Sequence, residues 1–205
     1  MSCVYLRVTC KPKRMNDIVK NIINKISSIS DKSFLEIERL LEFESYAKGE
    51  TFISKNKRNI NEYFVLNGIC KSYLINPAGE EITISFFLEN SILSPHSTRV
   101  SNNISSHYFK ALTELELASI NAIAFEKLMI DNLEIRNFGN AVLQLELQSK
   151  VEKEIGLASF TAKERLIAFR QKHKGLENLI PHTDIASYLG ITNISLSRLR
   201  KDLSG

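Results

Sequence analysis

A long stretch without proline, residues 133–159, constrains the fold of this chain more than any other feature. Its apolar residues fall in two stripes at helical spacing. The first stripe consists of Ile135, Phe138, Val142 and Leu145. The second, on the opposite side, consists of Leu143, Leu147, Val151 and Ile155. A helix that is apolar on two faces must be covered twice. We expect the first stripe to pack on a domain of its own chain. The second stripe has coiled-coil-like spacing and is expected to pair with a second copy. The alternative is a helix buried within one chain.

The region before this helix changes character near Phe43. An amphipathic helix is predicted for residues 16–29. A second follows a cap at Ser30-Asp31 and continues through Leu35 to about residue 42, and a short helix is predicted for 124–129. From Phe43 to Ile120, short apolar runs alternate with turn signals: Lys48-Gly49-Glu50, Asn67-Gly68 and Asn76-Pro77-Ala78-Gly79. Several short strands at close spacing predict an antiparallel sandwich or small barrel.

Composition narrows the possible functions. The 205 residues are 43% hydrophobic and 24% charged, which is ordinary for one or two globular domains. The net charge of +4 permits nucleic-acid binding without implying it. No run approaches the ~20 apolar residues of a membrane span, and the apolar start at residues 1–8 lacks a preceding charged region and makes a poor signal peptide. We therefore expect a cytoplasmic protein without membrane contact.

No cofactor, metal or catalytic site is expected. Cys3, Cys10 and Cys70 are interpreted as free thiols, too few for an iron–sulfur cluster. The histidines are scattered without a close ligand pair: His96, His107, His173 and His182. There is no glycine-rich phosphate loop and no nucleophile elbow. The chain is predicted not to be an enzyme.

Residues 182–201 have the pattern of a helix-turn-helix. Ala186 is small where two helices would cross, and Gly190 stands in the turn, where a positive φ is needed. Thr192 is a good N-cap for the second helix. The expected shared core consists of Ile185, Leu189, Ile191, Leu196 and Leu199.

The outer surface of the second helix suits the major groove of double-stranded DNA. It carries Asn193, Ser197, Arg198 and Lys201. Arginine can bond O6 and N7 of guanine, and asparagine can pair with adenine. Thr192, Ser195 and Lys201 are better placed for phosphates, and His182 for solvent or a phosphate. The alternative is a surface helical hairpin with an incidental arginine.

The whole layout resembles the cyclic-AMP-receptor/Fnr (Crp/Fnr) family of bacterial regulators, over about residues 18–203. The strongest matches are Ile185-Ala186-Ser187-Tyr188-Leu189-Gly190 and Leu196-Ser197-Arg198-Leu199. The resemblance implies an α+β fold: an N-terminal β-roll, similar to a cyclic nucleotide-binding domain, a long dimerisation helix and a C-terminal helix-turn-helix. It also implies that Arg198 and Ser197 read bases. Ile194 stands where the family usually has a glutamate, and it can touch a thymine methyl but cannot accept from cytosine. The β-hairpin wing that many members carry after the second helix is missing before Gly205.

The effector pocket departs further from the family. Ser94-Pro95 replaces the Gly-Glu pair of cyclic-nucleotide binders, and Ser105 and Ser106 stand where the phosphate-binding arginine would lie. Arg99 is nearby but out of register. A buried cyclic phosphate would therefore be poorly compensated, and we expect no tight binding of cyclic AMP. Another small-molecule effector, of unknown identity, remains open.

The expected organisation is an extension (1–15), a β-roll with flanking helices (16–132), a dimerisation helix (133–159) and a DNA-binding domain (160–205). The predicted function is a homodimeric transcription regulator that binds a pseudo-palindromic operator and works with RNA polymerase. One alternative is a small-molecule-binding protein of the cupin type, which would need clustered His and Glu in the strands. Another is a sensor module that does not bind DNA.

Overall fold

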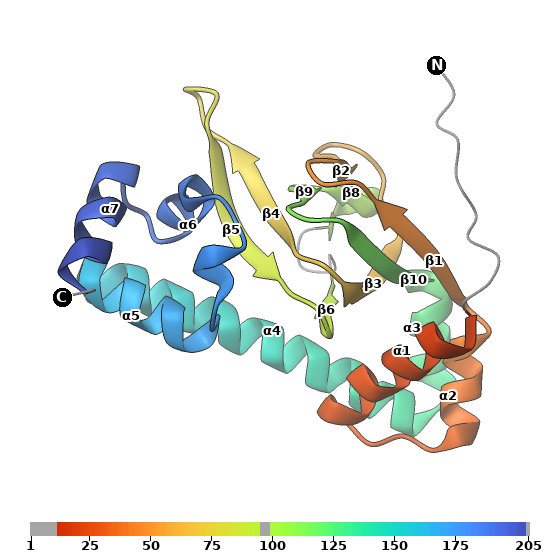
Figure 1. Ribbon diagram of the computed structural model, residues 1–205. Coiled ribbons are helices and arrows are strands. Elements are labelled where there is room, and N and C mark those ends of the chain that lie inside the picture. Colours follow the sequence, from red (N-terminus) through yellow and green to blue (C-terminus); the bar gives the residue numbers. More distant parts are fainter. Residues whose placement is uncertain (1–11, 95–98, 204–205) are drawn as a thin grey trace.

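The computed structural model describes residues 12–94 and 99–203 and consists of a β domain spanned by one long helix (Figure 1). Two helices open the chain: α1 (Pro12–Ile26) and α2 (Asp31–Glu38). The strands are β1 (Leu41–Tyr46), β2 (Thr51–Ile53), β3 (Asn61–Asn67), β4 (Cys70–Ile75), β5 (Glu81–Phe87), β6 (Ser91–Leu93), β7 (Arg99–Val100), β8 (Ile104–Ser105), β9 (Tyr108–Ala111) and β10 (Leu115–Asn121), with the 3-10 turn η2 (Ser101–Asn103) between β7 and β8. The helices that follow are α3 (Ala122–Asp131), α4 (Leu133–Ser159), α5 (Ala162–Lys172), the 3-10 helix η3 (Leu176–Asn178), α6 (His182–Tyr188) and α7 (Asn193–Asp202).

The strands form two four-stranded antiparallel sheets, in the orders β1-β10-β3-β6 and β2-β9-β4-β5, and a small β7-β8 ribbon. Apolar side chains between the sheets form one core, which includes Val65, Phe109 and Leu117. The predicted antiparallel sandwich is therefore confirmed. Gly68, between β3 and β4, has φ +91°, and a Cβ there would lie 2.1 Å from the carbonyl oxygen of Glu114. Only glycine fits this connection.

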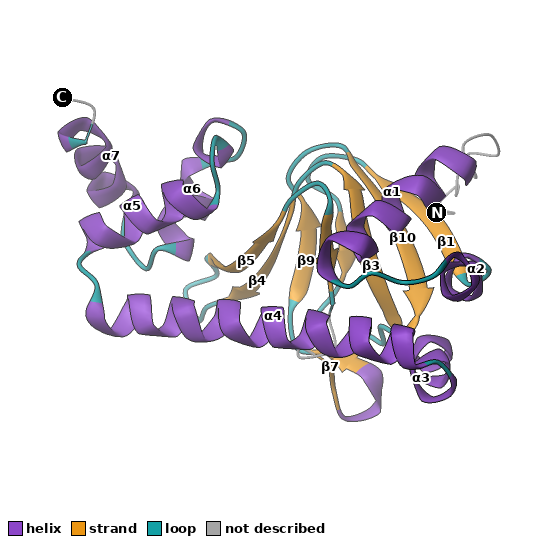
Figure 2. Ribbon diagram, turned by 90° about the horizontal axis from the view of Figure 1, so that it is seen from below, coloured by secondary structure: helices purple, strands orange, loops and turns teal. Residues whose placement is uncertain are grey.

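Helices cover the outer face of the first sheet. Val19 and Ile23 of α1, Ile37 of α2 and Ile135 and Phe138 of α4 join one buried cluster with the strands. Figure 2 shows α4 running from this helical end of the molecule to the C-terminal helices. Polar caps set where the helices begin.

The capping side chains also tie the helices together. Asn132 caps α4 by accepting from the backbone of Glu134 and Ile135. The Glu134 carboxylate in turn accepts from the hydroxyls of Ser30 and Ser33 at the start of α2.

The predicted bounds of the first two helices were wrong, and the first, predicted for residues 16–29, spans Pro12–Ile26. The second helix was predicted to run to about residue 42 but ends at Glu38. Leu41 already belongs to β1, where it pairs with Ile120 of β10. A short apolar run suits a helix or a strand equally, and pairing with β10 decides between them. The first helix begins at Pro12, where proline is compatible with a first helical turn. Most of the expected extension, with Cys3 and Cys10, lies outside the described residues.

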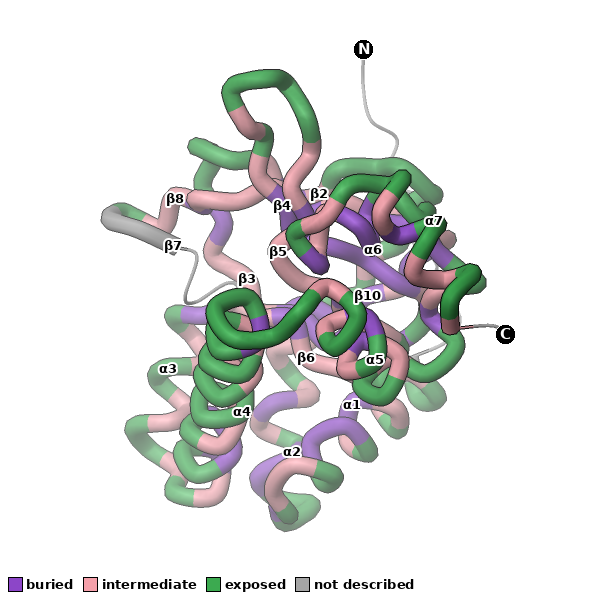
Figure 3. Tube along the Cα trace, turned by 90° about the vertical axis from the view of Figure 1, so that its left-hand side faces the viewer, coloured by how far each residue is buried: buried purple, intermediate pink, exposed green. Residues whose placement is uncertain are grey.

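The two stripes of α4 have different surroundings. Ile135 and Phe138 are buried on the β domain, but Leu145 is 51% exposed, so the covered stripe is shorter than predicted. The second stripe is exposed along its whole length, at 39–64% for the four side chains Leu143, Leu147, Val151 and Ile155. Figure 3 shows the exposed residues along the outer side of α4.

Candidate nucleic-acid interface

Helices α6 and α7 meet in a tight turn whose geometry follows from its sequence. Gly190 has φ +66°, which permits the change of direction between the two helices. The Thr192 hydroxyl accepts from the backbone N–H of Ser195 at 3.1 Å, so the predicted N-cap is present. Leu196 of α7 is buried with Ile185 of α6 in the shared core. The second helix is therefore held at a defined angle to the first.

The outer face of α7 is open to solvent. Asn193, Ser197, Arg198 and Lys201 are exposed, and Ile194 is 67% exposed. Asn193, Ser197 and Lys201 follow one line along the helix at i, i+4 spacing. Ile194 and Arg198 form the adjacent line. The structure thus brings together the side chains that were predicted to contact bases.

Two of the predicted phosphate contacts also take part in the cap. The hydroxyls of Thr192 and Ser195 lie 2.9 Å apart, and Ser195 is half-buried. Thr192 itself is exposed at the amino end of α7. Backbone N–H groups at a helix start attract anions, so this end of α7 suits a DNA phosphate.

Sequence reasoning missed an ion network that braces the helix-turn-helix. Glu177 accepts from Arg170 of α5 at 2.7 Å and pairs with Arg200 of α7 at 2.6 Å. The hydrogen bond from Arg170 lowers the pKa of Glu177 most, and the charges of Arg170 and Arg200 lower it further, against the opposing effect of burial. Arg200 also lies 3.1 Å from Nδ1 of His182. Arg200 therefore stabilises the position of α7, unlike the exposed Arg198 two positions before it, which lies about 200° away around the helix axis.

The segment that was expected to replace a cyclic-nucleotide site is only partly described, because Pro95 and His96 and the Arg99 side chain lie outside the described residues. Ser105 is fully buried, and its hydroxyl donates to the carbonyl of His107 at 2.8 Å. The Ser106 hydroxyl lies 2.8 Å from Nδ1 of the same histidine. These serines therefore have partners within their own loop.

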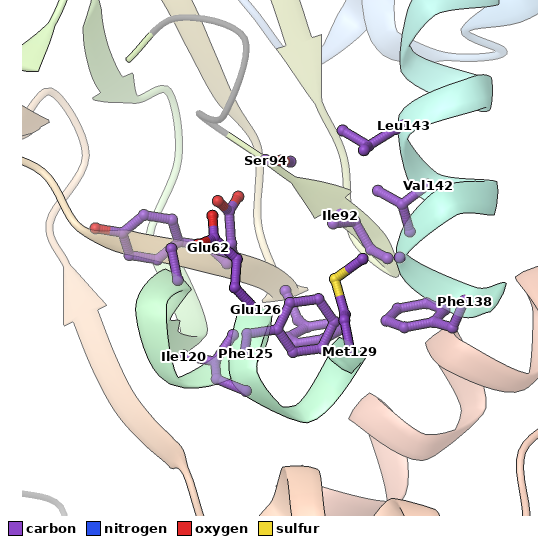
Figure 4. Close-up of a pocket in the computed structure, with 14 residues that line it drawn as sticks. Glu62, Ile92, Ser94, Ile120, Phe125, Glu126, Met129, Phe138, Val142 and Leu143 are labelled. Carbon is purple, nitrogen blue, oxygen red and sulfur yellow. The ribbon is translucent and has the colours of Figure 1, made fainter. Parts of the chain in front are cut away.

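An apolar cavity of about 110 Å³ lies between the first sheet and helices α3 and α4 (Figure 4). Phe125, Met129 and Phe138 crowd one end of it, and the Phe125 and Phe138 rings meet edge to face at 6.2 Å. Ser94 and the carboxylates of Glu62 and Glu126 are among its few polar groups. Sites for drug-sized ligands are usually ~300–1,000 Å³, so this cavity is too small and too apolar for a nucleotide.

Within the described residues, no group of three or more His, Cys, Asp or Glu side chains is arranged to hold a metal ion. Cys70, the described cysteine, is completely buried, which raises the pKa of its thiol far above the usual range. None of the described helices has the length and apolarity of a membrane span.

Comparisons with known proteins agree with this architecture. Residues 43–132 match the family described as cyclic nucleotide-binding domain. The chain is 26% identical over 172 residues to the global nitrogen regulator of Nostoc sp., covering 78% of this chain and 77% of the relative. It is 27% identical over 184 residues to the nitrogen fixation regulation protein FixK of Bradyrhizobium diazoefficiens, covering 84% and 76%.

The solved structure of FixK2 from Bradyrhizobium japonicum superposes with a TM-score of 0.70 at 20% identity, covering 80% of this chain and 84% of that one. Fold and matches together define a cyclic nucleotide-binding-like β domain joined by a long helix to a helix-turn-helix. In layout the chain is therefore similar to regulators of the Crp/Fnr family, with a cyclic nucleotide-binding-like domain over residues 43–132. The predictions of family and fold are thus confirmed.

Proposed function

We propose that this protein is a cytoplasmic DNA-binding transcription regulator of the Crp/Fnr type, without enzymatic activity, that binds its operator as a homodimer. The observation that carries the proposal is the exposed face of α7, where Asn193, Ser197 and Arg198 project from a capped and braced helix. An exposed Arg-Asn surface on the second helix of such a pair suits base edges in the major groove. The relatives described as regulators support this function.

Arg198 is proposed to read guanine and Asn193 adenine, with Ser197 between them and Ile194 against a thymine methyl. Thr192, Ser195 and Lys201 are proposed to hold the flanking phosphates. The target half-site should differ from that of members with a glutamate at the position of Ile194, because an isoleucine cannot accept from cytosine.

Dimerisation is proposed to use the exposed stripe of α4, formed by Leu143, Leu147, Val151 and Ile155. A monomer would leave these four apolar side chains in water on one helix face. Pairing of two such helices about a two-fold axis covers them and gives the dimer two copies of α7 related by the same axis.

Control by cyclic AMP is not part of the proposal. Ser105 and Ser106 supply no cation for a buried phosphate and are bonded within their own loop. Isothermal calorimetry with cyclic AMP should show no binding at micromolar concentrations. A different small-molecule effector and a contact with RNA polymerase stay open predictions.

Selection of bound fragments from a random pool of double-stranded DNA tests the function. We expect enrichment of an imperfect palindrome whose half-sites lie ~10 bp apart, or a multiple of this. Arg198→Ala removes a side chain that is proposed to read a base. Arg200→Ala removes the ion pair with Glu177 and shows the effect of a general disturbance of the helix-turn-helix. Enrichment of a single unrepeated half-site would contradict the homodimer, and no enrichment at all would contradict DNA binding.

A further inference from the structure

The helix-turn-helix is docked on the β domain of its own chain. Helix α6 lies along β5, which is the edge strand of the second sheet (Figure 1). An edge strand exposes N–H and C=O groups that have no partner within the sheet. Here three of those groups are bonded to side chains of α6 and α4.

Three hydrogen bonds join this strand edge to the helices. The backbone N–H of Thr83 donates to the Ser187 hydroxyl at 2.8 Å, and that hydroxyl donates to the carbonyl of Glu81 at 3.2 Å. The ammonium of Lys153 on α4 donates to the carbonyl of Ile84 at 2.6 Å. Ile84 is the extra residue of a bulge between the Ser85 and Thr83 pairs of the β4–β5 ladder, so its carbonyl is turned away from β4.

Beneath α6 lies Lys71 of β4, which is only 1% exposed. Its ammonium makes two ion pairs of 2.6 Å, one with Glu81 of the neighbouring strand and one with Asp184 of α6. Lys110 of β9 also contacts Glu81. Two lysines and two carboxylates therefore form a neutral group, to which the helix-turn-helix contributes one member. A buried charge needs such compensation, so Lys71 favours the docked position of α6.

Apolar contacts extend the same interface. The ring of Phe86 in β5 lies 5.2 Å from the ring of Tyr188 and 6.1 Å from that of Phe169. Ile69 and Leu112 of the β domain belong to the same buried cluster as Leu196 of α7. The two domains thus share one apolar core.

Docking uses the buried side of α6 and leaves the outer face of α7 uncovered. Asp184, Ile185 and Ala186 are buried, whereas Asn193 and Arg198 stay exposed. The docked arrangement therefore leaves the face of α7 that is proposed to contact DNA accessible to solvent.

We propose that Lys71 is a positioning residue for DNA recognition: through Asp184 it holds the helix-turn-helix in the orientation that reads the operator. This inference rests on the proposed function. In a two-fold dimer, two helix-turn-helix units of fixed orientation fit one spacing of half-sites. Units that are loosely held can bind half-sites at several spacings. Fixing the orientation of the helix-turn-helix units before DNA binds also reduces the conformational entropy that is lost on binding.

The test compares the full-length wild type with Lys71→Met, Asp184→Asn and the double variant, using the operator found by selection. Lys20→Met is the control, because this lysine pairs with Asp31 between α1 and α2 and belongs to neither the ion group nor the helix-turn-helix. Hydrogen exchange of the Thr83 amide measures docking, because its acceptor belongs to α6. Affinity is measured for the operator and for versions with one or two base pairs inserted between the half-sites.

We expect Lys71→Met to accelerate exchange at Thr83 and to weaken operator binding at least tenfold. It should also reduce the penalty for altered spacing, which a general loss of folded protein would not do. The double variant should add little to either single variant, and Lys20→Met should stay within about threefold of the wild type. Asp184→Asn, which keeps the shape of its side chain, replaces Lys71→Met if the latter fails to fold.

Unchanged affinity and spacing preference in variants that undock would overturn the proposal. So would tighter binding, which would make the docked state inhibitory, or unchanged exchange at Thr83. If the wild type itself enriches no DNA, the proposed function fails instead, and the exchange data still report whether Lys71 holds the domains together.

Discussion

The exposed stripe of α4 predicts the effect of a single substitution on self-association. Leu147 is 64% exposed, the highest fraction among the four stripe residues. Fully burying a leucine side chain stabilises by about 1.5–3 kcal/mol, so covering the exposed part of Leu147 contributes about 1–2 kcal/mol. A two-fold interface contains this side chain twice, which doubles the loss in Leu147→Glu to about 2–4 kcal/mol. Bringing two carboxylates into the interface adds to this cost.

In binding terms, about 2–4 kcal/mol raises the dimer dissociation constant roughly 30- to 1000-fold. Sedimentation velocity over a concentration series measures it. The matched control is Leu145→Glu, because Leu145 is 51% exposed on the same helix but lies roughly 200° around its axis from Leu147. The control should associate like the wild type. Leu147→Glu should also bind a palindromic operator no better than an isolated half-site.

Two results would refute this reasoning. One is a Leu147→Glu protein that dimerises as tightly as the wild type. The other is a Leu145→Glu protein that dissociates to the same extent, because the interface would then not be confined to the predicted stripe.

Three further substitutions give separate predictions. Arg198→Ala should cost about 1–3 kcal/mol of operator affinity and relax the preference at one base pair, measured by competition with single-base operator variants; equal loss on all DNA would argue for a phosphate contact instead. Gly68→Ala should lower the free energy of unfolding in urea by at least about 2 kcal/mol, because its Cβ would meet a carbonyl oxygen at 2.1 Å. The control is Gly79→Ala, where φ is +83° but the space is open, and it should lower the free energy of unfolding by only about 1 kcal/mol. Burial, with the charge of Lys172, lowers the pKa of His173 from 6.5 to about 4. The unfolded chain therefore binds more protons as pH falls from 6.5 towards 4, and stability is lost in that window, by about 1–2 kcal/mol after allowance for partial exposure. His173→Phe should abolish this contribution, and an unchanged pH slope would contradict the assignment.

Local patterns predicted those parts of the fold that local physics determines. The long helix α4 spans residues 133–159 as expected, because its periodicity extends over many turns. The turn at Gly190 and the cap at Thr192 were predictable for a similar reason, since backbone dihedrals and unpaired N–H groups select particular residue types. The exposed position of Arg198 on α7 follows from helical spacing alone.

The boundaries of the helices and the extent to which their apolar stripes are buried were less predictable. Leu41 fits the helical pattern before it, but pairing with Ile120, far along the chain, places it in a strand. Leu145 continues the apolar stripe of Phe138 and Val142, which packs on the remote β domain, yet Leu145 itself is 51% exposed. In both cases the deciding partner is remote in sequence, and a local pattern contains no information about it.

The same limit explains why the docking of the helix-turn-helix was not predicted. Helical spacing correctly placed Ile185 and Leu196 in a shared core, but that core also contains Phe86 and Ile69 of the β domain. A pattern identifies the apolar face of an element without identifying every element that packs on it. Lys71 gave no signal either, because a lysine alternating with apolar residues in a strand ordinarily points to solvent. Its burial beneath Asp184 means that the boundary predicted near residue 160 divides the chain by element type, whereas the apolar core and the ion network cross that boundary. A substitution in β4 or β5 should therefore change how firmly α7 is held, although no residue of either strand belongs to the predicted DNA-contacting set.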